Sequence, residues 1–232
     1  MPDLTLTAAD GHSFGAYRAD PPENFSGAAR GGIVVIQEIF GVNSHIRSIC
    51  DRLAAEGYVA IAPALFDRTE RDFQSGYSPQ EVEQARKFLA DIDWDGYLRD
   101  SDAARAAVAD VGKVGIVGFC LGGSVAFLAA TRLAGFSAAS GFYGGRIADF
   151  ADEVAQCPLQ LHFGGQDHSI PMSNVDKVRA GQPDSELYVY EQAGHGFNCD
   201  ERASFHADAA QLAWARTLAF FARAFPATPQ TL

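Results

Sequence analysis

The chain is 232 residues long, 47% of its residues are hydrophobic, and its formal net charge is −11. This length suits one α/β sheet with helices on both faces, and the apolar fraction excludes a disordered chain. Binding to nucleic acid is also excluded, because it requires a basic stripe that this sequence lacks. The sequence has no recognisable signal peptide and no apolar stretch of the roughly 18 residues that a membrane helix needs. We therefore expect one domain over residues 1–232, cytoplasmic and without a membrane partner.

The four cysteines are Cys50, Cys120, Cys157 and Cys199. They form no CxxC pair, and no histidines accompany them at the spacing typical of zinc sites. The sequence therefore predicts free thiols, with no bound metal and no cofactor. For the oligomeric state we expect a monomer or a weak homodimer.

In chain order, apolar runs alternate with helical patterns, which is typical of a parallel sheet with crossover helices. The segments 4–6 and 14–17 flank the turn signal Asp10-Gly11 and predict a hairpin. Further strands are expected at 33–36, 59–62, 114–117, 138–142, 159–163 and 187–190. Helices are expected from Asn43 or Ser44 to Glu56, and over 80–92, 98–109, 123–133, 171–180 and 200–225.

Residues 114–123 (VGIVGFCLGG) contain a G-x-C-x-G version of the G-x-S-x-G nucleophile elbow. The motif joins a predicted strand to a predicted helix, so Cys120 would sit in a strained turn that requires residues as small as Gly118 and Gly122. The sulfur would lie at a helix N-terminus, where the dipole favours thiolate, with the N–H of Leu121 facing a developing oxyanion. A buried core cysteine is the alternative. A dinucleotide loop is disfavoured because the spacing is not G-x-G-x-x-G.

Asp167 follows the predicted strand 159–163, and His195 follows the predicted strand 187–190. Parallel strands bring their carboxyl ends to one edge of the sheet, where α/β proteins place their sites. Asp167 would fix the tautomer of His195, which would accept and return protons. A turn-capping aspartate and an ordinary loop histidine are the alternatives, and the adjacent His168 is a competing candidate.

With these motifs in place, the sequence resembles the dienelactone hydrolases (carboxymethylenebutenolidases), from about residue 10 to residue 225. Four segments carry the resemblance: 37–43 (QEIFGVN), 118–123 (GFCLGG), 164–168 (GGQDH) and 193–197 (AGHGF). The resemblance implies an α/β-hydrolase fold, with a mostly parallel central sheet of about seven or eight strands and helices on both faces.

The resemblance also implies a catalytic triad of Cys120, His195 and Asp167. It further implies that Glu38 interacts with the thiol and helps to generate thiolate when substrate arrives. Because Glu38 directly follows an apolar run, we expect it to be partly desolvated, and bracing of its own loop is the alternative role. The implied oxyanion hole consists of two backbone N–H groups, those of Ile39 and Leu121.

The sequence departs from the family pattern at two arginines that hold the substrate carboxylate in the best-known members. Their positions fall on or near Val82 and Cys199. Arg86 lies one helical turn beyond Val82, and Arg202 lies near Cys199, so both are candidate substrate-binding residues, with solvent exposure as the alternative. The aromatic candidates for the substrate pocket are Phe40, Tyr143 and Phe197.

These features together predict an enzyme that cleaves a lactone or enol ester of a small molecule through an acyl-thioester on Cys120. A broad-specificity carboxylesterase or thioesterase is the alternative among enzymes. The alternative outside enzymes is a non-catalytic ligand-binding protein on the same fold, which the complete set of triad residues disfavours.

Overall fold

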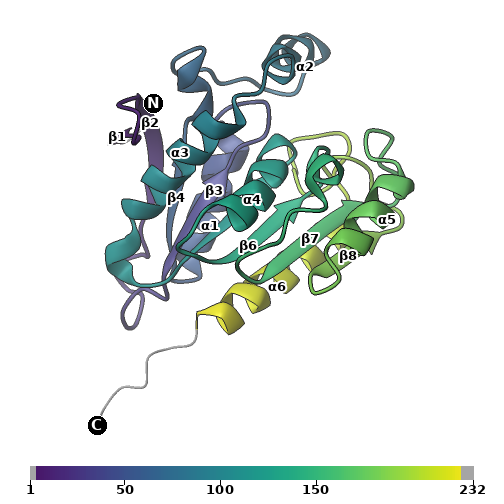
Figure 1. Ribbon diagram of the computed structural model, residues 1–232. Helices are drawn as coiled ribbons and strands as arrows, with labels where there is room; N and C mark the ends of the chain where they lie inside the picture. The colour runs from purple at the N-terminus through teal and green to yellow at the C-terminus, as the bar shows by residue number, and fades with distance from the viewer. Residues whose placement is uncertain (1–3, 226–232) are drawn as a thin grey trace.

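The computed structural model describes residues 4–225 and contains one eight-stranded sheet in the order β1-β2-β4-β3-β5-β6-β7-β8 (Figure 1). β1 pairs antiparallel with β2, and β2 pairs antiparallel with β4, whereas all other neighbours are parallel. The strands are β1 (Leu4–Thr7), β2 (Ser13–Ala19), β3 (Gly32–Ile36), β4 (Val59–Pro63), β5 (Val114–Phe119), β6 (Phe136–Phe142), β7 (Leu159–Gly164) and β8 (Glu186–Tyr190). The expected mostly parallel sheet and its hairpin are confirmed.

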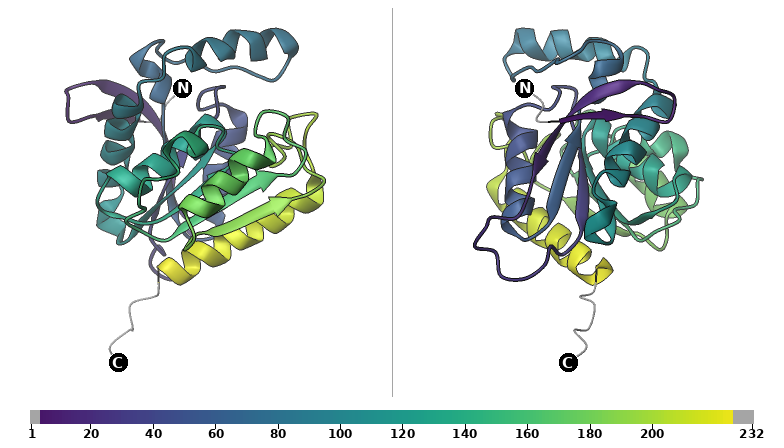
Figure 2. Two further views of the ribbon diagram at one scale, coloured as in Figure 1. Left: turned by 45° about the vertical axis from the view of Figure 1, so that its right-hand side comes forward. Right: turned by 90° about the vertical axis from the view of Figure 1, so that its left-hand side faces the viewer.

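The helices lie on both faces of this sheet, as expected for the α/β-hydrolase fold. The α-helices are α1 (Ser44–Ala55), α2 (Pro79–Ala85), α3 (Trp94–Ala106), α4 (Leu121–Arg132), α5 (Met172–Gly181) and α6 (Ala207–Ala224). The 3₁₀ helices are η1 (Leu65–Arg68), η2 (Arg86–Leu89), η3 (Ala109–Val111) and η4 (Ile147–Phe150). α1 and α6 cover one face, α3, α4 and α5 cover the other, and α2 lies beyond one end of the strands (Figure 2). Across residues 4–225, every helix is too short or too polar to cross a membrane.

The central strands show why the sequence folds as a buried parallel sheet. Every residue of β3, β4 and β5 is buried, so these strands lack the alternation of apolar and polar residues seen when one face is wet. At the antiparallel edge, β1 instead alternates half-buried and exposed residues. The strand ends of this rigid sheet are therefore available to hold functional loops.

Three helix boundaries differ from the predictions because polar side chains cap the helices at other residues. The predicted helix 80–92 is shorter: α2 tightens into η2 at Arg86, and the Asp93 side chain then caps α3 by accepting the N–H of Gly96 at 2.8 Å. That cap starts α3 at Trp94, ahead of the predicted residue 98. The predicted helix 200–225 begins only at Ala207, where the His206 side chain accepts the N–H of Ala209. Residues 200–206 are consequently a turn-rich loop near the expected site.

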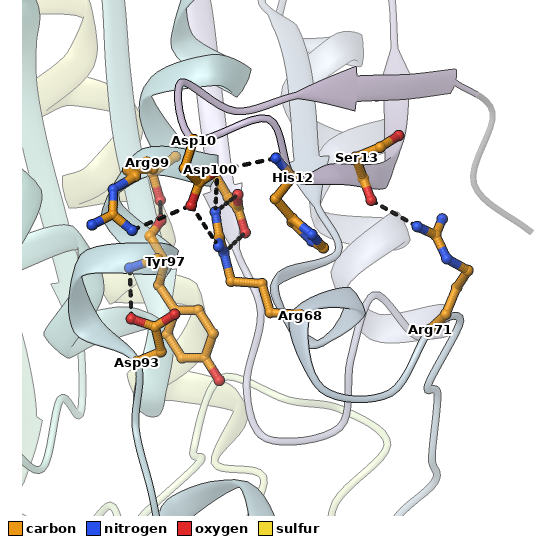
Figure 3. A network of polar contacts seen from close by, with 11 residues as sticks. Asp10, His12, Ser13, Arg68, Arg71, Asp93, Tyr97, Arg99 and Asp100 are labelled. Atoms are coloured by element: carbon orange, nitrogen blue, oxygen red, sulfur yellow. Dashed lines mark hydrogen bonds and ion pairs between the residues drawn. The ribbon is translucent and has the colours of Figure 1, made fainter.

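A polar network fixes the β1–β2 hairpin to the rest of the molecule (Figure 3). Arg68 of η1 donates to both carboxylate oxygens of Asp100 in α3, at 2.8 and 2.7 Å, and lies 2.9 Å from Asp10 in the hairpin turn. The Asp100 side chain is fully buried, and burial raises the pKa of its carboxyl despite the opposing Arg68 guanidinium. The same guanidinium lowers the pKa of Asp10. One arginine thus links three segments at the antiparallel edge.

Candidate active site

Cys120 occupies a sharp turn between β5 and α4, with φ of 55° and ψ of −114°. A Cβ at Gly118 would overlap the carbonyl oxygen of Gly122, and a Cβ at Gly122 would overlap the carbonyl oxygen of Ile36. Because the left-handed conformation of a non-glycine residue costs about 1–3 kcal/mol, the surrounding structure must hold it in place. The N–H of Cys120 does so by donating to the Phe142 carbonyl at 3.0 Å. This is the elbow geometry expected from the glycine spacing.

The structure brings Cys120, His195 and Asp167 together in a line. The Sγ atom of Cys120 lies 3.2 Å from Nε2 of His195, and Nδ1 of His195 lies 2.7 Å from Oδ2 of Asp167. Cys120 follows β5, Asp167 follows β7, and His195 follows β8, so three strand ends place the three side chains at one edge. The competing His168 is exposed to solvent, and His195 is the histidine that contacts Asp167.

Asp167 is fixed by its own loop. Its Oδ1 atom accepts the backbone N–H groups of Ser169 at 2.8 Å and Ile170 at 3.2 Å, which leaves Oδ2 for His195. The Asp167 side chain is completely buried. A buried carboxylate with these donors keeps one orientation, so it also sets the orientation of the imidazole.

The charge state of His195 follows from its neighbours. Burial acts to lower the pKa of His195, but the negative charge of the Cys120 sulfur and the hydrogen bond to Asp167 outweigh it and raise the pKa to about 10. The imidazolium is therefore stabilised by the sulfur and the carboxylate on either side of the ring. This arrangement suits a histidine that exchanges protons with the sulfur.

Two backbone N–H groups are available beside the sulfur. Leu121 is the first residue of α4, so its N–H has no acceptor within the helix. Within residues 4–225, neither the N–H of Leu121 nor that of Ile39 donates a backbone hydrogen bond, and both residues line the same cleft as Cys120. Both N–H groups are therefore free to donate a hydrogen bond, as an oxyanion hole requires.

A cleft of about 640 Å³ opens above the sulfur. Its walls combine the elbow with α2, η2 and the surrounding loops. The lining residues are Ile39, Phe40, Val82, Arg86, Leu89, Ala90, Cys120, Leu121, Ser124, Gly145, Arg146, Ser169, His195 and Arg202. Among the substrate-binding candidates, Phe40, Arg86 and Arg202 lie in this lining. Tyr143 and Phe197 do not: both side chains are completely buried behind His195, with the Tyr143 ring centroid 5.1 Å from that of His195.

Glu38 is buried and pairs with Arg202 instead of contacting the sulfur. Its Oε1 atom lies 3.0 Å from Nη1 of Arg202, and Oε2 accepts the hydroxyl of Tyr77 at 3.5 Å. Glu38 is 1% exposed, so this ion pair is held in a low-dielectric environment. Arg202 thus takes part in the ion pair and also lines the cleft.

The sequence analysis missed Tyr77 and Arg146. Tyr77 receives a hydrogen bond from Asn43 at 3.0 Å and packs edge-on against Phe40, with ring centroids 4.7 Å apart. Its only sequence signal is the Ser78–Glu81 capping box that fixes the start of α2 just after it. Arg146 enters the cleft because its N–H donates to the Ser124 hydroxyl at 3.1 Å. Its position after the strand that ends near Tyr143 was the available signal.

Comparison with known proteins agrees with this geometry. The profile of the dienelactone hydrolase family matches residues 14–225. A carboxymethylenebutenolidase of Pseudomonas putida is 35% identical over 232 residues, which cover 94% of this chain and 95% of that protein. A Synechocystis protein, provisionally named a carboxymethylenebutenolidase, is 38% identical over 208 residues, with 82% and 84% covered. A solved structure from Klebsiella pneumoniae, provisionally named a dienelactone hydrolase, superposes with a TM-score of 0.81 at 32% identity and covers 95% of this chain and 98% of its own. The chain therefore belongs to the dienelactone hydrolase family and has the α/β-hydrolase fold.

Proposed function

We propose that the protein hydrolyses a lactone or enol ester of a small molecule, with Cys120 as the nucleophile. The observation that carries the proposal is the 3.2 Å contact between Sγ of Cys120 and Nε2 of His195 in a cleft of about 640 Å³. A cleft of this size suits a small molecule. The name carboxymethylenebutenolidase of the Pseudomonas putida relative supports a lactone as the substrate.

In the first step, the Cys120 thiolate attacks the carbonyl carbon and forms a C–S bond. The N–H groups of Ile39 and Leu121 donate to the resulting oxyanion. The intermediate then collapses: the C–O bond breaks, the enolate leaves, and an acyl-thioester remains on Cys120. The imidazolium of His195 supplies the proton that the leaving group takes up. An enolate suits a thiolate nucleophile because it is readily expelled from the tetrahedral intermediate.

In the second step, His195 accepts a proton from a water molecule, which attacks the thioester carbonyl. The C–S bond breaks, the carboxylic acid product leaves, and the thiolate–imidazolium pair is restored. Asp167 keeps the imidazole in the orientation that both steps need. No group outside this chain is required for the balance of atoms or electrons.

For Glu38 and Arg202 we propose a linked role. Arg202 pairs with Glu38 and also lines the cleft, so a substrate carboxylate that engages Arg202 competes with Glu38 for the guanidinium. A Glu38 freed in this way accepts a proton from any Cys120 present as thiol, which generates the nucleophile when substrate arrives. Arg86 is the second guanidinium that we assign to the substrate carboxylate.

The apolar part of the cleft bears on the choice of substrate. Val82 and Leu89 form part of the cleft wall, and Val82 falls on or near a position where the family pattern has an arginine. This wall favours an uncharged acyl or leaving group, which makes a simple aryl ester a second candidate substrate. Because Arg86 and Arg202 line the same cleft, we rank a lactone with a carboxylate first and an aryl ester second.

The decisive test replaces the nucleophile. We expect Cys120→Ala to reduce hydrolysis of cis- and trans-dienelactone to background while the protein stays folded, because the acyl-thioester can no longer form. Cys157→Ala, which removes a half-buried thiol elsewhere, serves as the matched control and should retain activity. Unchanged turnover in Cys120→Ala would refute the mechanism.

A substrate panel separates the enzymatic alternatives. Dienelactones, aryl esters and acyl-thioesters are compared by kcat/KM with the wild-type protein. A preference for dienelactones supports the proposal, whereas a flat profile indicates a broad esterase or thioesterase. Iodoacetamide labelling addresses the non-catalytic alternative: labelling of Cys120 that substrate blocks supports catalysis, and an inert sulfur opposes it.

A further inference from the structure

Three potential metal ligands meet beside the active site although they are far apart in the sequence. Glu38 follows β3, His45 lies in the first turn of α1, and Cys199 lies in the loop before α6. One ligand atom from each lies within 4.8 Å of the others. The three residues are 1%, 2% and 0% exposed. The cluster is distinct from Cys120, His195 and Asp167.

We propose that Glu38, His45 and Cys199 form a binding site for Zn²⁺. A thiolate, an imidazole nitrogen and a carboxylate oxygen are the ligands that zinc takes in proteins, and a closed, buried site with three such groups suits zinc better than calcium or magnesium. The hard cations instead need a cage of oxygen atoms, which is not present here.

His45 provides an independent indication. Its Nδ1 atom lies 3.7 Å from Oδ1 of Asp200, whereas its Nε2 atom is buried and has no hydrogen-bond partner within residues 4–225. A buried polar atom without a partner is costly and rare in folded proteins. A metal ion bound at Nε2 gives that atom a partner, and Nδ1 then donates toward Asp200, the outer carboxylate that metal-bound histidines commonly have.

The geometry requires only a small contraction. Tetrahedral zinc, with ligand bonds of about 2.0–2.3 Å, brings its ligand atoms to about 3.5 Å from one another. The cluster with separations up to 4.8 Å must therefore close by about 1 Å. Cys199 belongs to a turn-rich loop, which can supply this movement. The hydroxyl of Tyr77, 3.5 Å from Oε2 of Glu38, or a water molecule is available as the fourth ligand.

Surrounding charges and access are compatible with a cation. Arg202 contacts Oε1 of Glu38, so the metal would take the other carboxylate oxygen. Arg52 adds a second positive charge near His45, whereas Asp200 and Glu201 place negative charge near the same imidazole. Asp200, whose side chain is 71% exposed, lines a surface hollow of about 230 Å³ on the solvent side of His45.

Binding involves no oxidation or reduction. The Cys199 thiol releases its proton to solvent as the sulfur–zinc bond forms, and the other two ligands donate electron pairs. Glu38 also pairs with Arg202, which lines the cleft, so zinc bound to Glu38 would act on the cleft through Arg202 and alter the turnover of substrate. That consequence rests on the proposed function, whereas metal binding itself does not.

The test uses cobalt as a spectroscopic substitute for zinc. The full chain is titrated with Co²⁺ while the near-ultraviolet thiolate-to-cobalt band is followed, and Zn²⁺ affinity is measured by calorimetry. We expect one ion per chain in the wild type. Cys199→Ser should remove the band and weaken zinc binding at least about tenfold, the lower end of what even outer-shell changes cost. The matched variant Cys120→Ser should keep both the band and the affinity.

Two further results complete the test. His45→Gln leaves all four thiols in place and should weaken zinc binding as Cys199→Ser does, so it decides the question if Cys199→Ser does not fold. The absence of stoichiometric binding in the wild type would overturn the proposal. A band that is lost in Cys120→Ser and retained in Cys199→Ser would also overturn it, because the metal would then bind at the active-site sulfur. Neither result depends on whether the protein hydrolyses any ester.

Discussion

Replacing Arg202 with methionine tests whether the Glu38–Arg202 ion pair is a buried, structural interaction. The two atoms of the pair lie 3.0 Å apart, and the side chains are 19% and 1% exposed. Removing one partner of a buried pair costs about 3–5 kcal/mol, because the other charge stays buried without compensation. Partial exposure of Arg202 and the nearby Tyr77 hydroxyl place the expected loss at about 3 kcal/mol. For a chain of this size, that loss lowers Tm by about 6–12 °C.

The assay is urea unfolding of the wild type, Arg202→Met, Glu38→Gln and the double variant. We expect the double variant to be more stable than the sum of the single changes predicts, since Glu38→Gln removes the charge that Arg202→Met leaves unpaired. Arg146→Met is the matched control, because Arg146 lines the same cleft but pairs with Asp149 at the surface, where its side chain is 56% exposed. A loss in Arg202→Met no larger than in Arg146→Met would refute the reasoning.

Three other predictions follow from the same structure. Gly118→Ala should lower the free energy of unfolding by more than about 2 kcal/mol because its Cβ would overlap backbone, whereas Gly145→Ala, whose nearest contact is 3.8 Å away, should be tolerated; equal losses in urea unfolding would contradict this. Asp100→Asn should cost about 3 kcal/mol because it removes the buried carboxylate that accepts two hydrogen bonds from Arg68, and Asp149→Asn should be nearly neutral in the same assay. The pKa of His195 is raised from 6.5 to about 10, so the stability that its imidazolium contributes is complete below pH 6.5 and is lost as the pH rises to about 10. Unfolding free energies of the wild type and His195→Gln should therefore converge over that range, and a constant difference would oppose the assignment.

The sequence was sufficient to predict every strand of the sheet described over residues 4–225, because buried parallel strands are short apolar runs bounded by turn residues. It also predicted which three strand ends meet. The signals used were the glycine spacing around Cys120 and the chain order of Asp167 and His195. In the folded chain, His195 contacts both Cys120 and Asp167. No long-range information was needed for that step.

The remaining features depend on contacts that no local pattern encodes. Asp93 and His206 set two helix starts at residues that differ from the predicted ones, because each side chain caps the helix that follows it. Tyr143 ends a strand at the catalytic edge, but its ring turns into the core and not into the cleft. The pairing of Arg202 with Glu38 joins residues 164 positions apart, so only the folded chain reveals it.

The wall formed by α2 and η2 has a consequence for how this enzyme family can diversify. The segment from Pro79 to Leu89 contributes Val82, Arg86 and Leu89 to the cleft but none of the groups assigned to bond making and breaking. Substitutions in this segment can therefore change substrate selectivity without changing the residues that make and break bonds. Replacing this segment with the corresponding segment of a relative that prefers other substrates is therefore a direct way to change substrate selectivity while the catalytic residues stay the same.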